Sequence, residues 1–221
     1  MEHTRGIPER RVAFLETCFD VLCENGLEHT SLKMLADACG VTNGNLIYYF
    51  GTKDNIVIES TAYCMAKVED DFMERAPRDY ADIERFLQEM PYVTAELHGA
   101  KYRTMYQVYS SPSYMEHGRE FFRGVNVRYR QYAETLSGNL GLPVDFIQGV
   151  IYVFVRACVH YAMFEDEEYL KLQLQAIRTS LSSCMGRTHD ELDGTVTERW
   201  RLVTDQRVMT SREPSTDSVN R

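Results

Sequence analysis

Amide, hydroxyl and ammonium side chains lie close together between positions 30 and 53. Asn43, Asn45 and Tyr48 fall within one short, otherwise mostly apolar segment, and threonine, serine and lysine residues stand on both sides of it. An asparagine amide can pair with N6 and N7 of adenine, whereas hydroxyl groups and ammonium ions hold phosphate oxygens. These residue types therefore indicate contacts with base edges and with a phosphate backbone.

Two short helices are expected to carry these side chains. Segments 31–39 and 43–50 are separated by a connection that contains Gly40, which can adopt the left-handed backbone conformation of a tight turn. Thr30, Thr42 and Thr52 stand where an N-cap hydroxyl is wanted, before each of these segments and before the next one. Two short helices joined in this way are typical of a helix-turn-helix.

Helical periodicity gives each of these helices an inner and an outer face. The inward residues of the first are Leu32, Leu35 and Ala36. On the second, Leu46 and Phe50 face inward, so that Gly44 and Tyr48 point outward. An exposed helical glycine lowers stability by about 1 kcal/mol relative to alanine. That loss makes sense if another backbone, here that of DNA, must approach closely.

Residues 9–58 resemble the DNA-binding domain of the TetR family of bacterial one-component transcription regulators. The matching groups occur in family order and at family spacing, and they are Gly26, Thr30-Ser31, Leu35-Ala36, Gly40-Val41-Thr42, Gly44-Asn45-Leu46, Tyr48-Tyr49-Phe50 and Thr52-Lys53-Asp54. Two positions depart from the pattern, because Ile47 stands where the family often has an aromatic hydroxyl and Tyr49 where histidine is common.

The resemblance implies roles that agree with the chemistry of the side chains. Asn43, Asn45 and Tyr48 are expected to reach base edges. The whole predicted DNA-binding set is Thr30, Ser31, Lys33, Thr42, Asn43, Gly44, Asn45, Tyr48, Tyr49, Thr52 and Lys53. A possible N-terminal arm would add Arg5, Arg10 and Arg11.

Charge restricts how the protein could bind nucleic acid. The 221 residues hold 24 Lys and Arg against 33 Asp and Glu, a net charge of −9. Such a balance does not suit a protein that coats nucleic acid non-specifically. Contacts with DNA must therefore be local.

The remaining chain also indicates helices, and the predicted fold class is all-α. Helices are expected at 9–25, from 53 to 75, at 79–97 with Pro91 kinking or ending the segment, from beyond Gly99 to 109, and then at 114–140, 144–164, 169–185 and from Thr188. The predicted domains are a three-helix DNA-binding domain at 1–52, a larger helical ligand-binding and dimerisation domain at 53–207, and a disordered tail at 208–221.

Tyrosine and methionine are dense between residues 60 and 160. Most such residues are core, but tyrosine hydroxyls beside pliable methionines also suit a pocket of mixed polarity. The predicted ligand-binding set is Tyr63, Tyr102, Met105, Tyr106, Tyr109, Phe122, Tyr129, Arg156 and His160. A buried Arg156 needs an anionic partner, expected to be an acid of a neighbouring helix, with a ligand carboxylate as the alternative.

The acidic clusters 69–71 and 165–168 are interpreted as solvated faces, with attraction of a cationic ligand as the weaker alternative. Six scattered cysteines without a Cys-x-x-Cys pair favour free thiols, and no histidines stand at metal-ligand spacing, so no metal or cofactor is expected. The pairs Cys158 with His160 and His117 with Glu120 lack an orienting group, which argues against an enzyme.

The expected function is a ligand-responsive repressor that binds a palindromic operator as a homodimer through helices 144–164 and 169–185. The alternative is a DNA-binding protein of the same fold whose C-terminal domain binds a protein partner. Segment 146–164 is apolar but contains Gln148, Arg156 and His160, and the N-terminus lacks an apolar signal core. We therefore expect no membrane helix and a cytoplasmic location.

Overall fold

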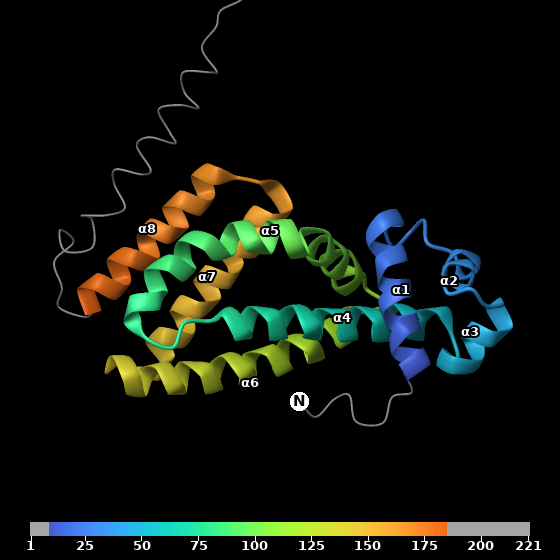
Figure 1. Ribbon diagram of the computed structural model, residues 1–221, viewed down its shortest axis with the longest axis horizontal. Coiled ribbons are helices and arrows are strands. Elements are labelled where there is room, and N and C mark those ends of the chain that lie inside the picture. The colour runs from blue at the N-terminus through green and yellow to red at the C-terminus, as the bar shows by residue number, and fades with distance from the viewer. Residues whose placement is uncertain (1–8, 185–221) are drawn as a thin grey trace, which may run out of the picture. The chain divides into compact units, whose positions relative to one another are not determined.

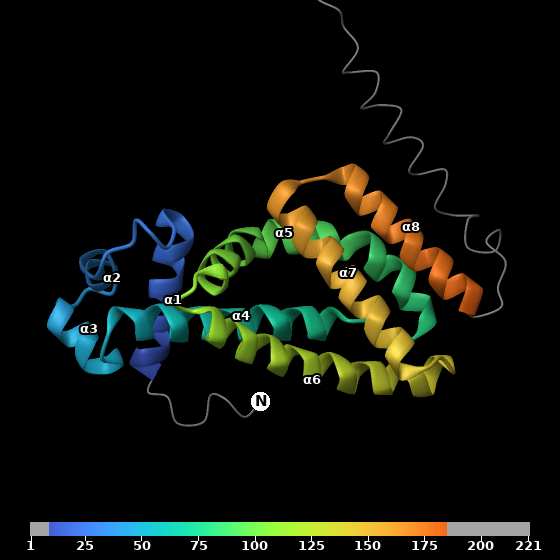
Figure 2. The ribbon, with the colours of Figure 1, turned by 180° about the vertical axis from the view of Figure 1, so that it is seen from behind.

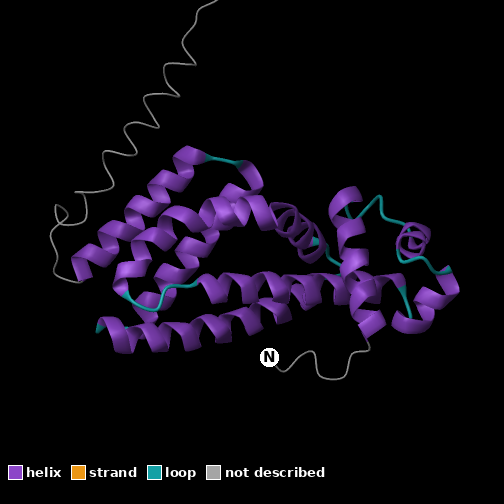
Figure 3. Cartoon of the chain, in the orientation of Figure 1, coloured by secondary structure: helices purple, strands orange, loops and turns teal. Residues whose placement is uncertain are grey.

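The computed structural model describes residues 9–184, and the regular structure of this part is entirely helical (Figure 3). The all-α prediction is confirmed. Figure 1 shows the eight described helices, which are α1 (Glu9–Asn25), α2 (Leu32–Ala38), α3 (Asn43–Phe50), α4 (Lys53–Arg75), α5 (Tyr80–Ser110), α6 (Met115–Leu140), α7 (Val144–Phe164) and α8 (Glu167–Cys184). The predicted helix from Thr188 and the predicted tail lie outside the described residues.

Hydroxyl side chains begin the three helices that follow α1. Ser31, Thr42 and Thr52 each accept a hydrogen bond from the backbone amide three residues further on, at 3.2, 3.2 and 3.1 Å respectively. Each bond satisfies one amide that the first turn would otherwise leave unpaired. The caps at Thr42 and Thr52 were predicted, but the cap of α2 is Ser31 rather than Thr30.

Helix α5 differs from its prediction, because it runs unbroken through Pro91. A proline inside a helix removes one backbone hydrogen bond and costs about 3 kcal/mol. Here the flanking turns are held by packing, since Leu87, Met90 and Thr94 are buried and α5 lies against α4, α6 and α7. The two predicted segments on either side of Gly99 are therefore one helix.

Within the described residues, those up to Leu174 form one compact unit, and those from Gln175 to Cys184 belong to a second. The first unit holds two clusters of buried side chains. One joins α1, α2, α3 and the start of α4 around Leu15, Leu35 and Leu46. The other joins α1, α4, α5 and α7 around Phe19, Met65 and Met105. Because both clusters lie in one unit, the predicted domain boundary at 52/53 stays a prediction.

Helices α1 and α4 take part in both clusters, and they pack on each other. Figures 1 and 2 show α4 leaving the α2–α3 region and continuing alongside α6. A single helix thus begins next to α3 and extends into the larger helical region.

Helix α7 has the length and composition of a membrane span, and it is the one helix within residues 9–184 that does. It packs against α5 and α6, and seven of its residues are buried, including Ile147, Phe154 and Cys158. Core helices can show the same hydropathy, so this pattern alone does not indicate a membrane.

Candidate functional site

The outer face of α3 is polar and open to solvent. Leu46 and Phe50 are buried, whereas Asn43, Gly44, Asn45 and Tyr48 are exposed, Tyr48 by 84% of its surface. The predicted inward and outward orientation of this helix is confirmed. A large phenol that the protein itself leaves in water, next to two amides, is a surface available to a partner.

Gly44 is the smallest residue of this face. Apart from its chain neighbours and the backbone of its own helix, no atom of the described protein lies within 4 Å of the position that a Cβ would take there. The fold itself therefore does not require glycine at this position. The open position leaves room for another backbone to approach closely.

The flanking polar residues are held by contacts within the protein. Lys33 pairs with Asp37 at 2.7 Å, and the ammonium group of Lys53 donates to the backbone carbonyl of Thr30. The exposed Ser31 and Thr52 are helix caps, as described above. These residues surround α3 and remain predicted phosphate contacts.

Two predicted contacts do not fit the geometry as expected. Thr30 is 1% exposed, and its hydroxyl donates to the carbonyl of Gly26 at 2.7 Å, so it cannot offer that hydroxyl to a phosphate. Tyr49 is half-buried, and its ring packs edge-on against Phe14 with 5.2 Å between centroids. The side chain of Tyr49 thus has a packing role as well.

The proposed basic arm is also different from the expectation. Arg10 and Arg11 belong to the first turns of α1, while Arg5 lies outside the described residues. Arg11 pairs with Glu59 of α4 and lies over the ring of Phe50 at 4.7 Å. The guanidinium group of Arg11 therefore links α1 to α3 and α4.

The cysteines carry no disulfide and are all free. Burial raises the pKa of the Cys18 thiol, whose sulfur lies 3.6 Å from that of Cys39. Within residues 9–184 no group of three or more His, Cys, Asp or Glu side chains could hold a metal ion.

A cavity of about 390 Å³ opens among α4, α5, α6 and α7. It contains six residues of the predicted ligand-binding set, and the full lining is Glu69, Tyr102, Met105, Tyr106, Phe122, Val125, Tyr129, Tyr152, Val155, Arg156 and Val159. Its walls are aromatic and aliphatic, with a few polar groups, as is usual for a small-molecule site.

The floor of this cavity carries the carboxyl group of Glu69, which was expected on a solvated face but is buried. Glu69 is 5% exposed, and the hydroxyl of Tyr129 donates to its Oε2 atom at 2.6 Å. Tyr102 also forms a side-chain hydrogen bond with it. Burial raises the pKa of Glu69 above its usual range, and the two tyrosine hydrogen bonds oppose that shift.

The mouth of the cavity is more open and carries the opposite charge. Arg156 is exposed and donates from its Nη1 atom to the hydroxyl of Tyr106 at 3.0 Å. Tyr152 and Phe122 are 39% and 43% exposed. The expected ion pair between a buried Arg156 and a neighbouring acid is wrong, because this guanidinium group reaches water and needs no such partner.

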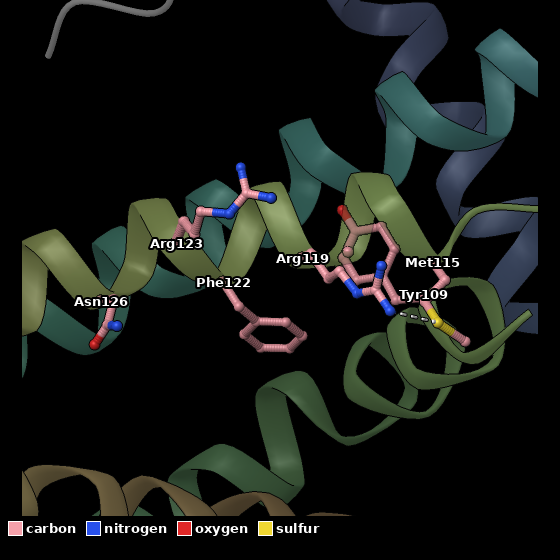
Figure 4. Close-up of a pocket in the computed structure, with 7 residues that line it drawn as sticks. Tyr109, Met115, Arg119, Phe122, Arg123 and Asn126 are labelled. Carbon is pink, nitrogen blue, oxygen red and sulfur yellow. Dashed lines mark hydrogen bonds between the residues drawn. The ribbon is translucent and has the colours of Figure 1, made fainter. Parts of the chain in front are cut away.

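A second, shallower groove of about 440 Å³ lies along α6 and the end of α5 (Figure 4). Tyr109 lies here rather than in the cavity, and its ring is 6.3 Å from that of Phe122. Phe122 lines both the groove and the cavity. Arg119 and Arg123 give the groove a basic rim, and both pair with Glu116.

Two members of the predicted ligand set lie elsewhere. Tyr63 packs between the two core clusters, with the ammonium of Lys67 5.8 Å from its ring centroid. His160 stacks on Tyr169 at 4.1 Å between ring centroids and lies 3.8 Å from a carboxylate oxygen of Asp166. Neither side chain lines the cavity.

Five lining residues were not in the predicted set, namely Glu69, Val125, Tyr152, Val155 and Val159. For Glu69 the signal was present in the sequence. It stands four residues after Met65 and three before Phe72, both buried, which places it on the inner face of α4. The valines carry no chemistry that would distinguish a cavity wall from ordinary core.

Residues 14–59 match the family described as "Bacterial regulatory proteins, tetR family". The HTH-type transcriptional regulator PksA of Bacillus subtilis (strain 168) is 31% identical over 80 residues, which are 36% of this chain and 39% of PksA. The matched segment therefore spans less than half of that relative.

Solved structures resemble the chain over most of its length. A TetR transcription regulator from Haloarcula marismortui ATCC 43049 aligns with a TM-score of 0.62 and 16% identity, over 80% of this chain and 98% of that one. The multidrug binding protein EbrR, complexed with malachite green, aligns with a TM-score of 0.52 and 15% identity, over 78% of this chain and 98% of that one. At these identities the likeness shows the fold.

The segment that matches the family contains α2, α3 and the first turns of α4, with the exposed polar face described above. Residues 14–59 therefore match the helix-turn-helix DNA-binding region of TetR-family transcriptional regulators, and the chain shares its fold with solved TetR regulators.

Proposed function

We propose that this protein is a cytoplasmic repressor that binds a palindromic operator as a homodimer and is released by a small molecule. The observation that carries the proposal is the exposed face of α3, where Gly44 has open space at its Cβ position, Asn45 follows it directly and Tyr48 stands one turn further on. Such a helix fits the major groove, where amide side chains can read adenine.

A dimer would place two recognition helices at the spacing of successive major grooves, about 34 to 36 Å or a multiple of it. Helix α7 offers an apolar face for this purpose. Gly149, Val153 and Phe164 are exposed, and their spacings of four and eleven residues place them on one side of the helix. Leu172 of α8 is also 60% exposed. We infer pairing through helices 144–164 and 169–185.

A small effector is favoured over a protein partner because the core beside α4 is not filled. The cavity of about 390 Å³ is large enough for a small organic molecule, and its walls join rings to a few polar groups. EbrR shows that a protein of this fold holds such a molecule, malachite green.

Helix α4 supplies a route for the response. Its first turn is capped by Thr52 directly after α3, and its fifth turn carries Glu69 on the cavity floor. A ligand that shifts α4 would therefore move α3. For a typical coupling, the ligand must bind the operator-incompetent arrangement about 1 to 3 kcal/mol more tightly than the competent one.

The DNA-binding face is tested with the full-length protein and a duplex obtained by selection from a random library. Replacement of Gly44 with alanine should leave the free protein as stable or up to about 1 kcal/mol more stable, because the space is open and alanine favours helix. The same change should weaken operator binding about 5- to 150-fold, the equivalent of one good base contact. Fluorescence anisotropy and urea unfolding measure the two effects.

Gly138→Ala provides the matched control, since this α6 glycine also has open space at its Cβ position. It should leave operator affinity unchanged. Tyr48→Ala should weaken binding to the selected palindrome more than to random duplex. Equal operator affinity of wild type, Gly44→Ala and Tyr48→Ala would rule out α3 as the recognition helix.

A further inference from the structure

The cavity holds a charge distribution that limits which molecules can fill it. Its floor is formed by Glu69 with Tyr102 and Tyr129, all at most 5% exposed, and Arg156 lies at its open side. The inference below rests on the proposed function, because the occupant of this cavity is taken to be the effector.

Glu69 has no cationic partner among the side chains of residues 9–184. Arg128, a basic residue whose charge favours ionisation of Glu69, is paired with Asp70 of α4. The carboxyl group instead receives hydroxyl donors from α5 and α6, Tyr102 and Tyr129. A cation placed against this buried carboxyl group would favour its ionised form and complete an ion pair with it.

The surroundings of this carboxyl group add little compensating charge. On α4 its neighbour Asp70 opposes ionisation, and on α6 Arg128 favours it. Across the cavity, α7 contributes the exposed Arg156, whose guanidinium group is bound to Tyr106 of α5. Because the interior has a low dielectric constant, a cation that reaches the carboxylate is attracted to it more strongly than it would be in water.

We propose that the cavity binds an amine attached to an apolar group about the size of an aromatic ring system. The ammonium group lies against Glu69, and the apolar group lies between the rings of Phe122 and Tyr152. An ammonium group brings the missing charge and hydrogen-bond donors to the two carboxylate oxygens. The aromatic rings of the cavity wall add cation–π attraction for the ammonium group as it enters toward Glu69.

An acidic ligand fits this arrangement less well. Its carboxylate would meet Arg156 at the solvent-exposed side, where an ion pair is worth at most about 1 kcal/mol. If it entered further, it would face Glu69 in the buried floor, and like charges there repel strongly. The floor of the cavity therefore favours ligands that present a hydrogen-bond donor or a cationic group to Glu69.

Three probes that share the same apolar biphenylbutyl group test the proposal on the full-length protein. They are 4-(biphenyl-4-yl)butylamine, the matching butanol and the matching butanoic acid, titrated by isothermal calorimetry. The amine should bind about tenfold or more tightly than the alcohol, since a charged hydrogen bond adds about 1.5 to 3 kcal/mol. The acid should bind more weakly than the alcohol.

Two variants test whether Glu69 causes the preference for the amine. Glu69→Gln keeps a carbonyl acceptor for the tyrosine hydroxyls and removes the charge, so it should abolish the preference for the amine and leave alcohol binding intact. Arg156→Met removes the guanidinium charge at the open side of the cavity and should leave the preference for the amine over the alcohol in place. A thermal unfolding scan verifies that both variants are folded.

The pH dependence gives a readout that a merely structural role would not change. The amine stays protonated near neutral pH, so its affinity should rise with pH as Glu69 ionises. Glu69→Gln should remove this rise. The groups facing Glu69 that could also titrate, Tyr102 and Tyr129, have pKa values raised above the ordinary tyrosine range and stay protonated.

The outcomes separate this inference from the proposed function. Tighter binding of the acid than of the alcohol, lost in Arg156→Met, would overturn it, and so would an amine affinity that Glu69→Gln leaves unchanged or no binding of any probe. Operator affinity is measured independently. Amine binding that depends on Glu69 but does not alter operator affinity would uphold the inference and count against the effector role.

Discussion

Two glycines of α6 stand in opposite surroundings. A Cβ atom added at Gly118 would lie 2.7 Å from Cβ and 2.9 Å from Cγ of Tyr109, whereas one added at Gly124 would meet nothing within 4 Å. Contacts below 3.0 Å do not occur between real side chains without movement. Because the base of the Tyr109 ring is fixed to α5, this movement must involve the two helices.

We predict that Gly118→Ala lowers the free energy of unfolding by about 1 to 3 kcal/mol, the usual effect of overpacking a core. Gly124→Ala should raise it by up to about 1 kcal/mol, because alanine favours helix and the site is open. Urea unfolding compares both with wild type. The assignment fails if the two variants shift stability in the same direction.

How far single residues could be predicted depends on what decides their position. The outward direction of Gly44 and Tyr48 followed from the 3.6-residue period, since Leu46 and Phe50 had to face the core. Glu69 was misjudged because it was grouped with Asp70 and Asp71 as a charge run, although Asp70 is exposed and Glu69 is buried. Local charge counts ignore that adjacent helical residues point in different directions.

At the scale of elements, helix ends were predictable and helix continuity was not. Glycines with positive φ, such as Gly26 and Gly141, end α1 and α6 where the sequence indicated. Pro91 was expected to interrupt a helix, yet α5 passes through it because α4, α6 and α7 hold both sides. Tertiary packing of this kind is not visible in a local pattern.

The exposed stripe of α7 leads to a prediction about assembly. Val153 is 41% exposed beside Gly149, so Val153→Glu would place two unpaired charges at a two-fold interface. An uncompensated buried charge costs about 3 to 5 kcal/mol. We expect wild type to be a dimer at micromolar concentration in light scattering and this variant to be largely monomeric.

Val127→Glu is the control, because Val127 is 58% exposed on α6, outside the proposed interface. It should leave the mass at that of the dimer. A monomeric wild type, or dissociation by Val127→Glu alone, would place the interface elsewhere or remove it.

At the scale of the whole molecule, one compact unit contains both α3 and the cavity. The sequence could indicate each region separately, since one is a short motif and the other a density of tyrosines. It could not show which side chains meet, because Glu69 and Tyr129 are 60 residues apart and are brought together by α4 packing near α6. The polar floor of the cavity is a product of that tertiary contact.

The buried carboxyl group also predicts how the stability of the fold depends on pH. Burial raises the pKa of Glu69 in the native state above its unfolded value. Between these two values the native state holds more protons than the unfolded state, so this residue makes the protein less stable as pH rises. Glu69→Gln cannot titrate, and its stability relative to wild type should therefore increase from about pH 5 to about pH 8.

Urea unfolding of both proteins at the two pH values measures the difference, and Tyr129→Phe, which removes a donor to the carboxylate but keeps the acid, should show a steeper loss than wild type. A constant difference between Glu69→Gln and wild type would mean that Glu69 titrates in the native state as it does in the unfolded chain.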